Sequence, residues 1–225
     1  MTQEELNEQL IKAVNNGDTA TVRKMLEQGA DPNSRDNWNN YGYTALMKAC
    51  RSGRTDTAGL LLEHGADPNV QDNYGKTTFM YACRNGEPEM IQMLLDAKVD
   101  PNVQSRDGYT ALMEAACSNP RGNRDVITAL ITAGAELDKR NNDSMTALMC
   151  LARGGYTGLM KLLIKAGADA ATKDDRGRTA LDILQDLHPG KYDRWIQNTI
   201  VKSRQQTLKR EDSRRSRRCE PDFDI

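Results

Sequence analysis

Apolar residues along this chain fall into short clusters with helical spacing, and the clusters come in pairs separated by polar loops. The first cluster of each pair opens with Thr-Ala-Leu-Met or a close variant, and the second carries a stripe of Leu. The inward positions are Leu46, Phe79, Leu112, Leu148 and Leu181 in the first helices, with Ala49, Ala82, Ala115 and Ala152 allowing close approach, and Leu61, Leu62, Leu94, Leu95, Leu130, Leu162 and Leu163 in the second. The pattern predicts stacked pairs of short helices.

Two landmarks share one period, which identifies an internal repeat. The Thr of the Thr-Ala-Leu-Met word and its variants falls at Thr44, Thr77, Thr110, Thr146 and Thr179, in steps of 33, 33, 36 and 33 residues. The residue that opens the Gly-Ala-Asp-Pro-Asn word, or its equivalent, falls at Gly29, Gly65, Lys98, Gly134 and Gly167, in steps of 36, 33, 36 and 33. Three extra residues are therefore inserted twice, in the loop 36–43 and in the turn 118–125.

Each repeated word has a structural role. The Thr is predicted to cap the first helix by accepting a hydrogen bond from a free backbone N–H. The Gly ends the second helix in the left-handed conformation, and the Asp-Pro-Asn that follows starts the turn to the next unit. Lys98 and Ser144 stand where glycine is expected.

The second unit, NNYGYTALMKACRSGRTDTAGLLLEHGADPN over 39–69, resembles the ankyrin repeat family. The resemblance covers about residues 4 to 185. It implies an all-α solenoid of stacked helix-turn-helix units with β-hairpin-like loops. We expect a repeat domain over 1–206, with units at 4–36, 37–72, 73–105, 106–141, 142–174 and 175–206, and a disordered basic tail over 207–225. Where the family has His, this chain has Met47, Met80, Met113 and Met149, so other groups must satisfy the loop amides.

The polar ends of the stack are predicted to be caps. The first helix is expected to face inward with Leu6, Leu10, Ile11 and Val14. The last unit is expected to close with a helix pair, TALDILQDL and 191–204, in which Trp195 covers the final apolar face.

Composition narrows the class of protein. Only 38% of the residues are hydrophobic and the chain has two Phe and two Trp, so the core must be thin. No run of 18 apolar residues could span a membrane, and the acidic start does not resemble a signal peptide. We therefore expect reduced cysteines and a cytoplasmic protein, with the nucleus or a host cell's cytoplasm as alternatives.

The sequence offers no pattern for an enzyme, a metal or a cofactor. Four cysteines, Cys50, Cys83, Cys117 and Cys150, recur in near register. Because successive helix layers lie about 10 Å apart, they are expected to be separate buried thiols and not one zinc site. His64 is expected to cap the end of a second helix, and His188 lies near no candidate nucleophile, so a catalytic triad has no support.

The resemblance implies that a partner protein binds the concave face, made of loop tips and first helices, with this chain as adaptor, inhibitor or targeting subunit. Tyr, Trp and Arg are enriched where binding energy concentrates. The predicted partner-binding residues are Trp38, Tyr41, Tyr43, Arg51, Tyr74, Lys76, Arg84, Arg106, Tyr109 and Arg153. The alternative is that these side chains only shield the loop joints. We expect the chain to be a monomer.

The end of the chain differs in charge from its body. Residues 202–218 hold eight basic and two acidic residues, a net charge of +6, whereas the whole chain has 31 basic and 32 acidic residues. The alternatives are a nuclear address, binding to RNA or an anionic membrane, phosphorylation at Ser213 or Ser216, and a plain solvated tail. The mildly acidic body argues against nucleic acid as the main partner.

Overall fold

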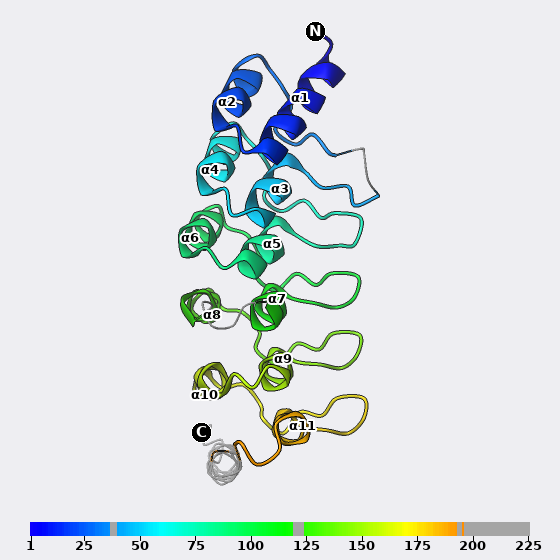
Figure 1. The fold of residues 1–225 in the computed structure, drawn as a ribbon, viewed down its shortest axis with the longest axis vertical. Helices are drawn as coiled ribbons and strands as arrows, with labels where there is room; N and C mark the ends of the chain where they lie inside the picture. The colour runs from blue at the N-terminus through cyan, green and yellow to red at the C-terminus, as the bar shows by residue number, and fades with distance from the viewer. Residues whose placement is uncertain (37–39, 119–123, 193–194, 196–225) are drawn as a thin grey trace, which may run out of the picture.

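Helix pairs stack along one axis in the computed structural model, which describes residues 1–36, 40–118, 124–192 and 195 (Figure 1). These residues contain eleven helices: α1 (Gln3–Asn16), α2 (Thr19–Glu27), α3 (Ala45–Arg51), α4 (Thr55–Glu63), α5 (Thr78–Asn85), α6 (Pro88–Asp96), α7 (Ala111–Ser118), α8 (Arg124–Thr132), α9 (Ala147–Arg153), α10 (Thr157–Ala166) and α11 (Ala180–Leu187). The odd-numbered helices form one row, the even-numbered helices a second, and the loops project from the first row away from the second (Figure 1). This confirms the predicted all-α solenoid.

The loops between pairs carry little regular β pairing. In the described residues, bridge pairing is limited to two isolated antiparallel bridges, Arg35 with Thr44 and Gln71 with Thr77. The hairpin-like shape that the resemblance implies is maintained by single backbone hydrogen bonds across each loop, such as Asp72 N to Lys76 O at 2.9 Å, together with side chains.

The repeated Thr caps the first helices as predicted. The Oγ1 atoms of Thr44, Thr77, Thr110, Thr146 and Thr179 accept hydrogen bonds from the backbone N–H three residues later, at 3.2 to 3.4 Å. The glycines that end the second helices are left-handed, for example Gly65 at φ 86°. Lys98, at the end of a second helix, is also left-handed (φ 59°). Ser144 (φ 56°) is left-handed at the loop position that Gly42 and Gly75 hold in other units, so both departures keep the backbone expected of glycine.

The core lies between the two rows of helices. Every Leu or Phe predicted to point inward from a first helix is buried, as are the alanines that follow. In the second helices Leu61, Leu94, Leu130 and Leu163 are buried, and Leu62, Leu95 and Leu162 are partly buried against them. Met47, Met80, Met113 and Met149 fill the same layer.

A row of buried polar side chains organises the loops in place of the family's His. Asp72 Oδ1 accepts hydrogen bonds from the backbone N–H of Tyr74 and of Lys76, both at 2.8 Å. Asn141 and Asp174 occupy the equivalent place and bind two loop amides each, and Ser105 Oγ binds one. These side chains are the groups that satisfy the loop amides in this chain, where Met replaces the family's His.

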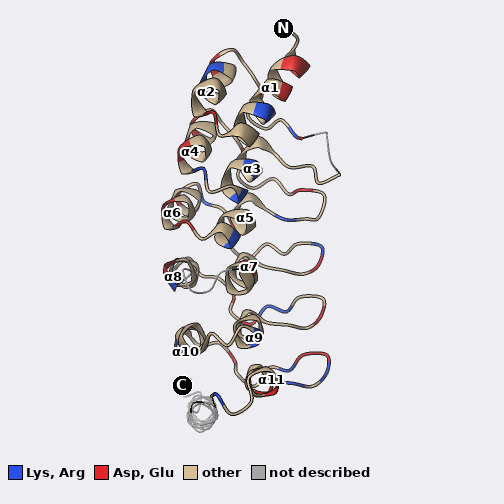
Figure 2. Ribbon diagram, in the orientation of Figure 1, with Lys and Arg blue, Asp and Glu red and all other residues tan. Residues whose placement is uncertain are grey.

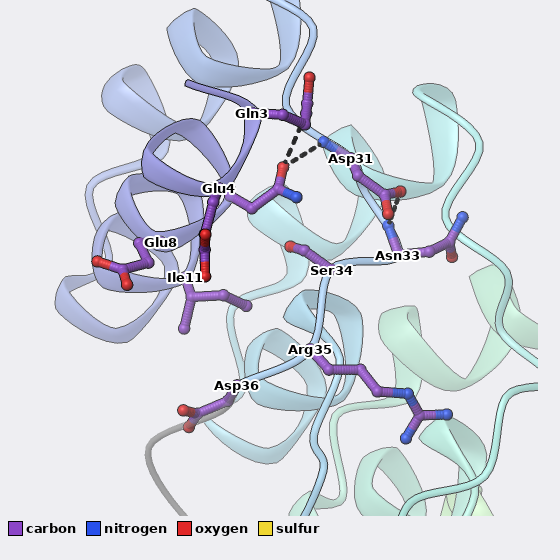
Figure 3. Close-up of a pocket in the computed structure, with 10 residues that line it drawn as sticks. Gln3, Glu4, Glu8, Ile11, Asp31, Asn33, Ser34, Arg35 and Asp36 are labelled. Atoms are coloured by element: carbon purple, nitrogen blue, oxygen red, sulfur yellow. Dashed lines mark hydrogen bonds between the residues drawn. The ribbon is translucent and has the colours of Figure 1, made fainter. Parts of the chain in front are cut away.

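An asparagine ladder joins successive units, and α1 supplies its first rung. Asn33 Nδ2 donates to Gly65 O at 3.2 Å, and Asn33 Oδ1 accepts from Asp67 N at 2.7 Å. At the start of the stack, Gln3 Nε2 donates to Gly29 O at 2.9 Å. Asn7 Oδ1 accepts from Asp31 N at 2.8 Å, and this second bond is drawn beside Asp31 in Figure 3. Gln3 and Asn7 of α1 thus make the two hydrogen bonds to the next turn that a single loop asparagine makes elsewhere in the ladder.

The other end of the stack is described only in part. Helix α11 is the first half of the predicted closing pair, and most of 191–204 lies outside the described residues. Trp195 is partly buried and packs against the hydrophobic core, with Lys161 Nζ 5.9 Å from the centre of its ring.

Candidate partner-binding face

Backbone hydrogen bonds tie the loop tips to one another. Tyr41 O accepts from Asn73 N and Tyr74 O accepts from Arg106 N, both at 2.9 Å. Such close approach requires glycine at Gly75, where φ is +72° and a Cβ atom would lie 2.9 Å from Arg106 N. The loops are therefore a continuous edge, and the tyrosines on them have fixed positions.

Four tyrosines form one cluster on this edge. The rings of Tyr41 and Tyr43 stack at 5.1 Å with an angle of 12°, and Tyr41 lies 5.4 Å from Tyr74. Tyr43 meets Tyr81 edge to face at 5.4 Å and 86°. Tyr41 and Tyr74 are 44% and 45% exposed, whereas Tyr43 and Tyr81 are 6% exposed, so the cluster has an exposed upper layer and a buried lower layer.

The exposed layer borders an open depression of about 640 Å³, which we call the tyrosine groove. It brings together six of the predicted partner-binding residues, Tyr41, Tyr43, Arg51, Tyr74, Lys76 and Arg84. Three residues that are not among the predicted ones also line it: Tyr81, Asn85 and Asp107.

The charges of the tyrosine groove are not equally available. Arg51 and Arg84 are exposed at the ends of α3 and α5, with the Arg51 guanidinium carbon 5.4 Å from the centre of the Tyr43 ring. Lys76 Nζ instead lies 2.6 Å from Oε1 of buried Glu114. The two arginines are therefore the cations best placed to meet a partner, and Lys76 supports the wall of the groove.

Tyr81 and Asp72 support the groove from below. The Tyr81 hydroxyl donates to Asp72 Oδ2 at 2.5 Å, and the same carboxylate organises the loop through its other oxygen. Burial, and then the hydrogen bond to Asp72, raise the pKa of Tyr81, so the phenol stays neutral. Sequence reasoning missed Tyr81 because it lies in a helix, next to the core residues Phe79 and Met80.

The other predicted residues do not line the tyrosine groove. Arg106 is exposed on the next loop, and Tyr109 is half-buried against the core. Arg153 borders a different depression, beside α11, together with Leu187. Trp38, Ser213 and Ser216 lie outside the described residues.

A further depression lies at the start of the stack and has the opposite charge. Glu4 and Glu8 of α1 line it together with Asp31 and Asp36 (Figure 3). Asp36 Oδ2 lies 2.5 Å from Lys48 Nζ. Acidic residues also mark the first turn of α1, while both signs of charge alternate along the loops (Figure 2).

The structure corrects two expectations about the cysteines. Cys50, Cys83 and Cys150 are buried, as expected, but Cys117 is exposed. The expectation that thiols of successive units stay apart is also wrong for one pair, because Cys117 and Cys150, on the contacting helices α7 and α9, lie near enough for each thiol to shift the pKa of the other. The distance between helix axes misled the prediction, since side chains between two axes can meet.

A family model for ankyrin repeats, which describes three copies, matches residues 10–105, 65–141 and 112–185. The chain is an ankyrin repeat protein. Ankyrin repeats are generally protein–protein interaction modules. No curated protein matches this ankyrin chain. In the part of it that the structure describes, no helix has the length and apolarity to cross a bilayer, and no cluster of three or more His, Cys, Asp or Glu could hold a metal ion.

Proposed function

We propose that this ankyrin chain binds an extended segment of a partner protein in the tyrosine groove, and that its role is recognition and not catalysis. The observation that carries the proposal is the exposed pair Tyr41 and Tyr74. They are two of only four exposed large hydrophobic residues among the described ones, and their rings lie side by side. Exposed aromatic rings held in place are typical of sites where binding energy concentrates.

The chemistry of the groove favours one kind of segment. The faces of Tyr41 and Tyr74 offer a stacking surface for an aromatic ring or a proline. Arg51 and Arg84 lie beside that surface and can each bind a carboxylate with two hydrogen bonds. The preferred segment therefore combines an aromatic residue or proline with Asp or Glu. An adaptor, an inhibitor and a targeting subunit would all use such a site.

Selection from a library of random peptides tests the proposal with the full chain. The wild type should enrich peptides that combine an aromatic residue or proline with Asp or Glu. The double substitution Tyr41→Ala with Tyr74→Ala should weaken the binding of these peptides by about 100-fold or more, because each ring is an anchor. Titration by fluorescence anisotropy would measure the loss.

Leu187→Ala is the matched control, because Leu187 is 53% exposed and lies outside the tyrosine groove. Its affinity for the same peptides should equal that of the wild type. Arg51→Glu with Arg84→Glu should change the enriched charge from acidic to basic. Equal binding by the wild type and the tyrosine double variant would contradict the proposal.

A second candidate rests on the charge of residues 202–218, which lie outside the described residues. Their net charge of +6 favours binding of RNA or an anionic membrane. If this holds, the full chain should bind RNA or phosphatidylserine vesicles with an affinity that falls steeply as salt rises, and removal of 208–225 should abolish binding. Peptide binding in the tyrosine groove should remain, which separates the two candidates.

A further inference from the structure

The register of the repeat places one position of each first helix against a second position in the next unit. Lys48, four residues after Thr44, donates from Nζ to Asn15 Oδ1 at 3.1 Å. Asn15 and Arg51 are equivalent positions of their units, because each lies two residues before a left-handed glycine, Gly17 or Gly53, in the turn after the first helix. The position seven residues after the Thr therefore lies against the position four residues after the next Thr.

In units four and five these two positions are Cys117 and Cys150. Cys117 is seven residues after Thr110, and Cys150 is four residues after Thr146. The helices that carry them, α7 and α9, are in contact, so the register sets the two side chains facing each other between these helices. The stacking of the two units therefore brings these two positions together.

The two thiols have different surroundings. Cys117 is exposed and holds the place that arginine holds at Arg51, Arg84 and Arg153. Its hydrogen bond with Cys150 lowers the pKa of Cys117, and the charges of Arg153 and Arg84 act in the same direction. The same hydrogen bond, and then burial, raise the pKa of Cys150. One thiol is ready to react and the other is protected beside it.

We propose that Cys117 and Cys150 are a peroxide-sensitive thiol pair in the row of first helices, in which Cys117 reacts first and Cys150 closes a disulfide between α7 and α9. The Cys117 thiolate attacks one oxygen of hydrogen peroxide, the O–O bond breaks, and hydroxide leaves to become water. Cys150 then loses its proton and attacks the sulfur of the sulfenic acid, the S–O bond breaks, and a second water forms. Two thiols are oxidised by two electrons, and the peroxide is reduced.

The inference does not depend on the proposed function, since it concerns chemistry within the chain. The disulfide would remove an exposed thiol between Arg84 and Arg153 and join two neighbouring units covalently. A reductant such as glutathione would restore both thiols by exchange.

Oxidation of the full chain with hydrogen peroxide tests this pair. After oxidation, free thiols are blocked with N-ethylmaleimide and peptides are identified by mass spectrometry. A peptide joining Cys117 to Cys150 is expected, with Cys50 and Cys83 unoxidised. Before oxidation, Cys117 should react with N-ethylmaleimide at least about tenfold faster than Cys50 or Cys83.

Three variants make the test specific. With Cys150→Ser, dimedone should label a sulfenic acid at Cys117, because no second thiol removes it. With Cys117→Ser, Cys150 should remain reduced. The fifth cysteine of the chain, Cys219, lies outside the described residues, and with Cys219→Ser the joined peptide should form as in the wild type. Two results with the wild-type chain would overturn the proposal. One is a disulfide from Cys117 to Cys219, and the other is oxidation of Cys117 no faster than that of buried Cys50.

Discussion

The loops before α3 and α5 and the loops before α7 and α9 share one backbone design and present different side chains. The position three residues before the helix-capping Thr is Tyr41 and Tyr74 in the first two loops and Asp107 and Asp143 in the others. The stack thus fixes positions, and single side chains decide what each position does. The loops before α3 and α5 form the tyrosine groove, whereas the helices α7 and α9 carry the thiol pair Cys117 and Cys150.

Removal of the groove's buried support is expected to have the largest effect. Asp72→Ala should lower the free energy of unfolding by about 3 kcal/mol, because two loop amides and the Tyr81 hydroxyl lose their acceptor. Ser105→Ala, at the equivalent place before α7, should cost only about 1 kcal/mol, because Ser105 accepts one loop hydrogen bond. Urea denaturation of both variants measures the difference. Equal losses would mean that the two loops are supported alike.

Lys76 and Arg84 separate support from recognition. Lys76→Met should lower the free energy of unfolding by about 2 kcal/mol, because it leaves the buried Glu114 carboxylate without its cation. Arg84→Met should change stability by less than about 0.5 kcal/mol, since Arg84 is exposed, yet it should weaken binding of acidic peptides. Adding Glu114→Gln to Lys76→Met should restore part of the stability. A Lys76→Met protein as stable as the wild type would show that the ion pair contributes nothing.

A gain of function is the smallest expected effect. Asp107 lines the tyrosine groove at the place that tyrosine holds in the two preceding loops. Asp107→Tyr should lengthen the aromatic row, remove a repelling carboxylate, and tighten binding of acidic peptides by about tenfold. Asp143→Tyr is the control, because Asp143 lies beside another depression. An equal gain in peptide affinity from both variants would mean that an added tyrosine increases binding nonspecifically, wherever it lies.

The sequence predicts the fold well because the structural words repeat. Thr44 and its equivalents cap helices through local hydrogen bonds, and local chemistry is visible in a motif. Even Lys98 and Ser144 hold the left-handed backbone that glycine was expected to hold. The period therefore carries more information than any single residue does.

The site is harder to predict because exposure depends on contacts between units. Tyr43 was expected on a loop tip, but stacking under Tyr41 buries it, so its replacement by Ala would damage the fold as well as any binding. Lys76 reaches Glu114 in the next unit, 38 residues along the chain. Cys117 and Cys150 meet for the same reason. Lys76 and the cysteines each depend on a residue one repeat away, and Tyr43 also meets Tyr81 of the next unit, where no local pattern can indicate the contact.

The bonds between loop tips have a kinetic consequence. Because Tyr41 O and Tyr74 O are each held by the following loop, a ligand need not order the edge when it arrives. Little conformational entropy is then lost on association, and differences in affinity among ligands should come from how slowly each one leaves. Loosening a single tip, even far from a ligand's contacts, would shorten the lifetime of the complex.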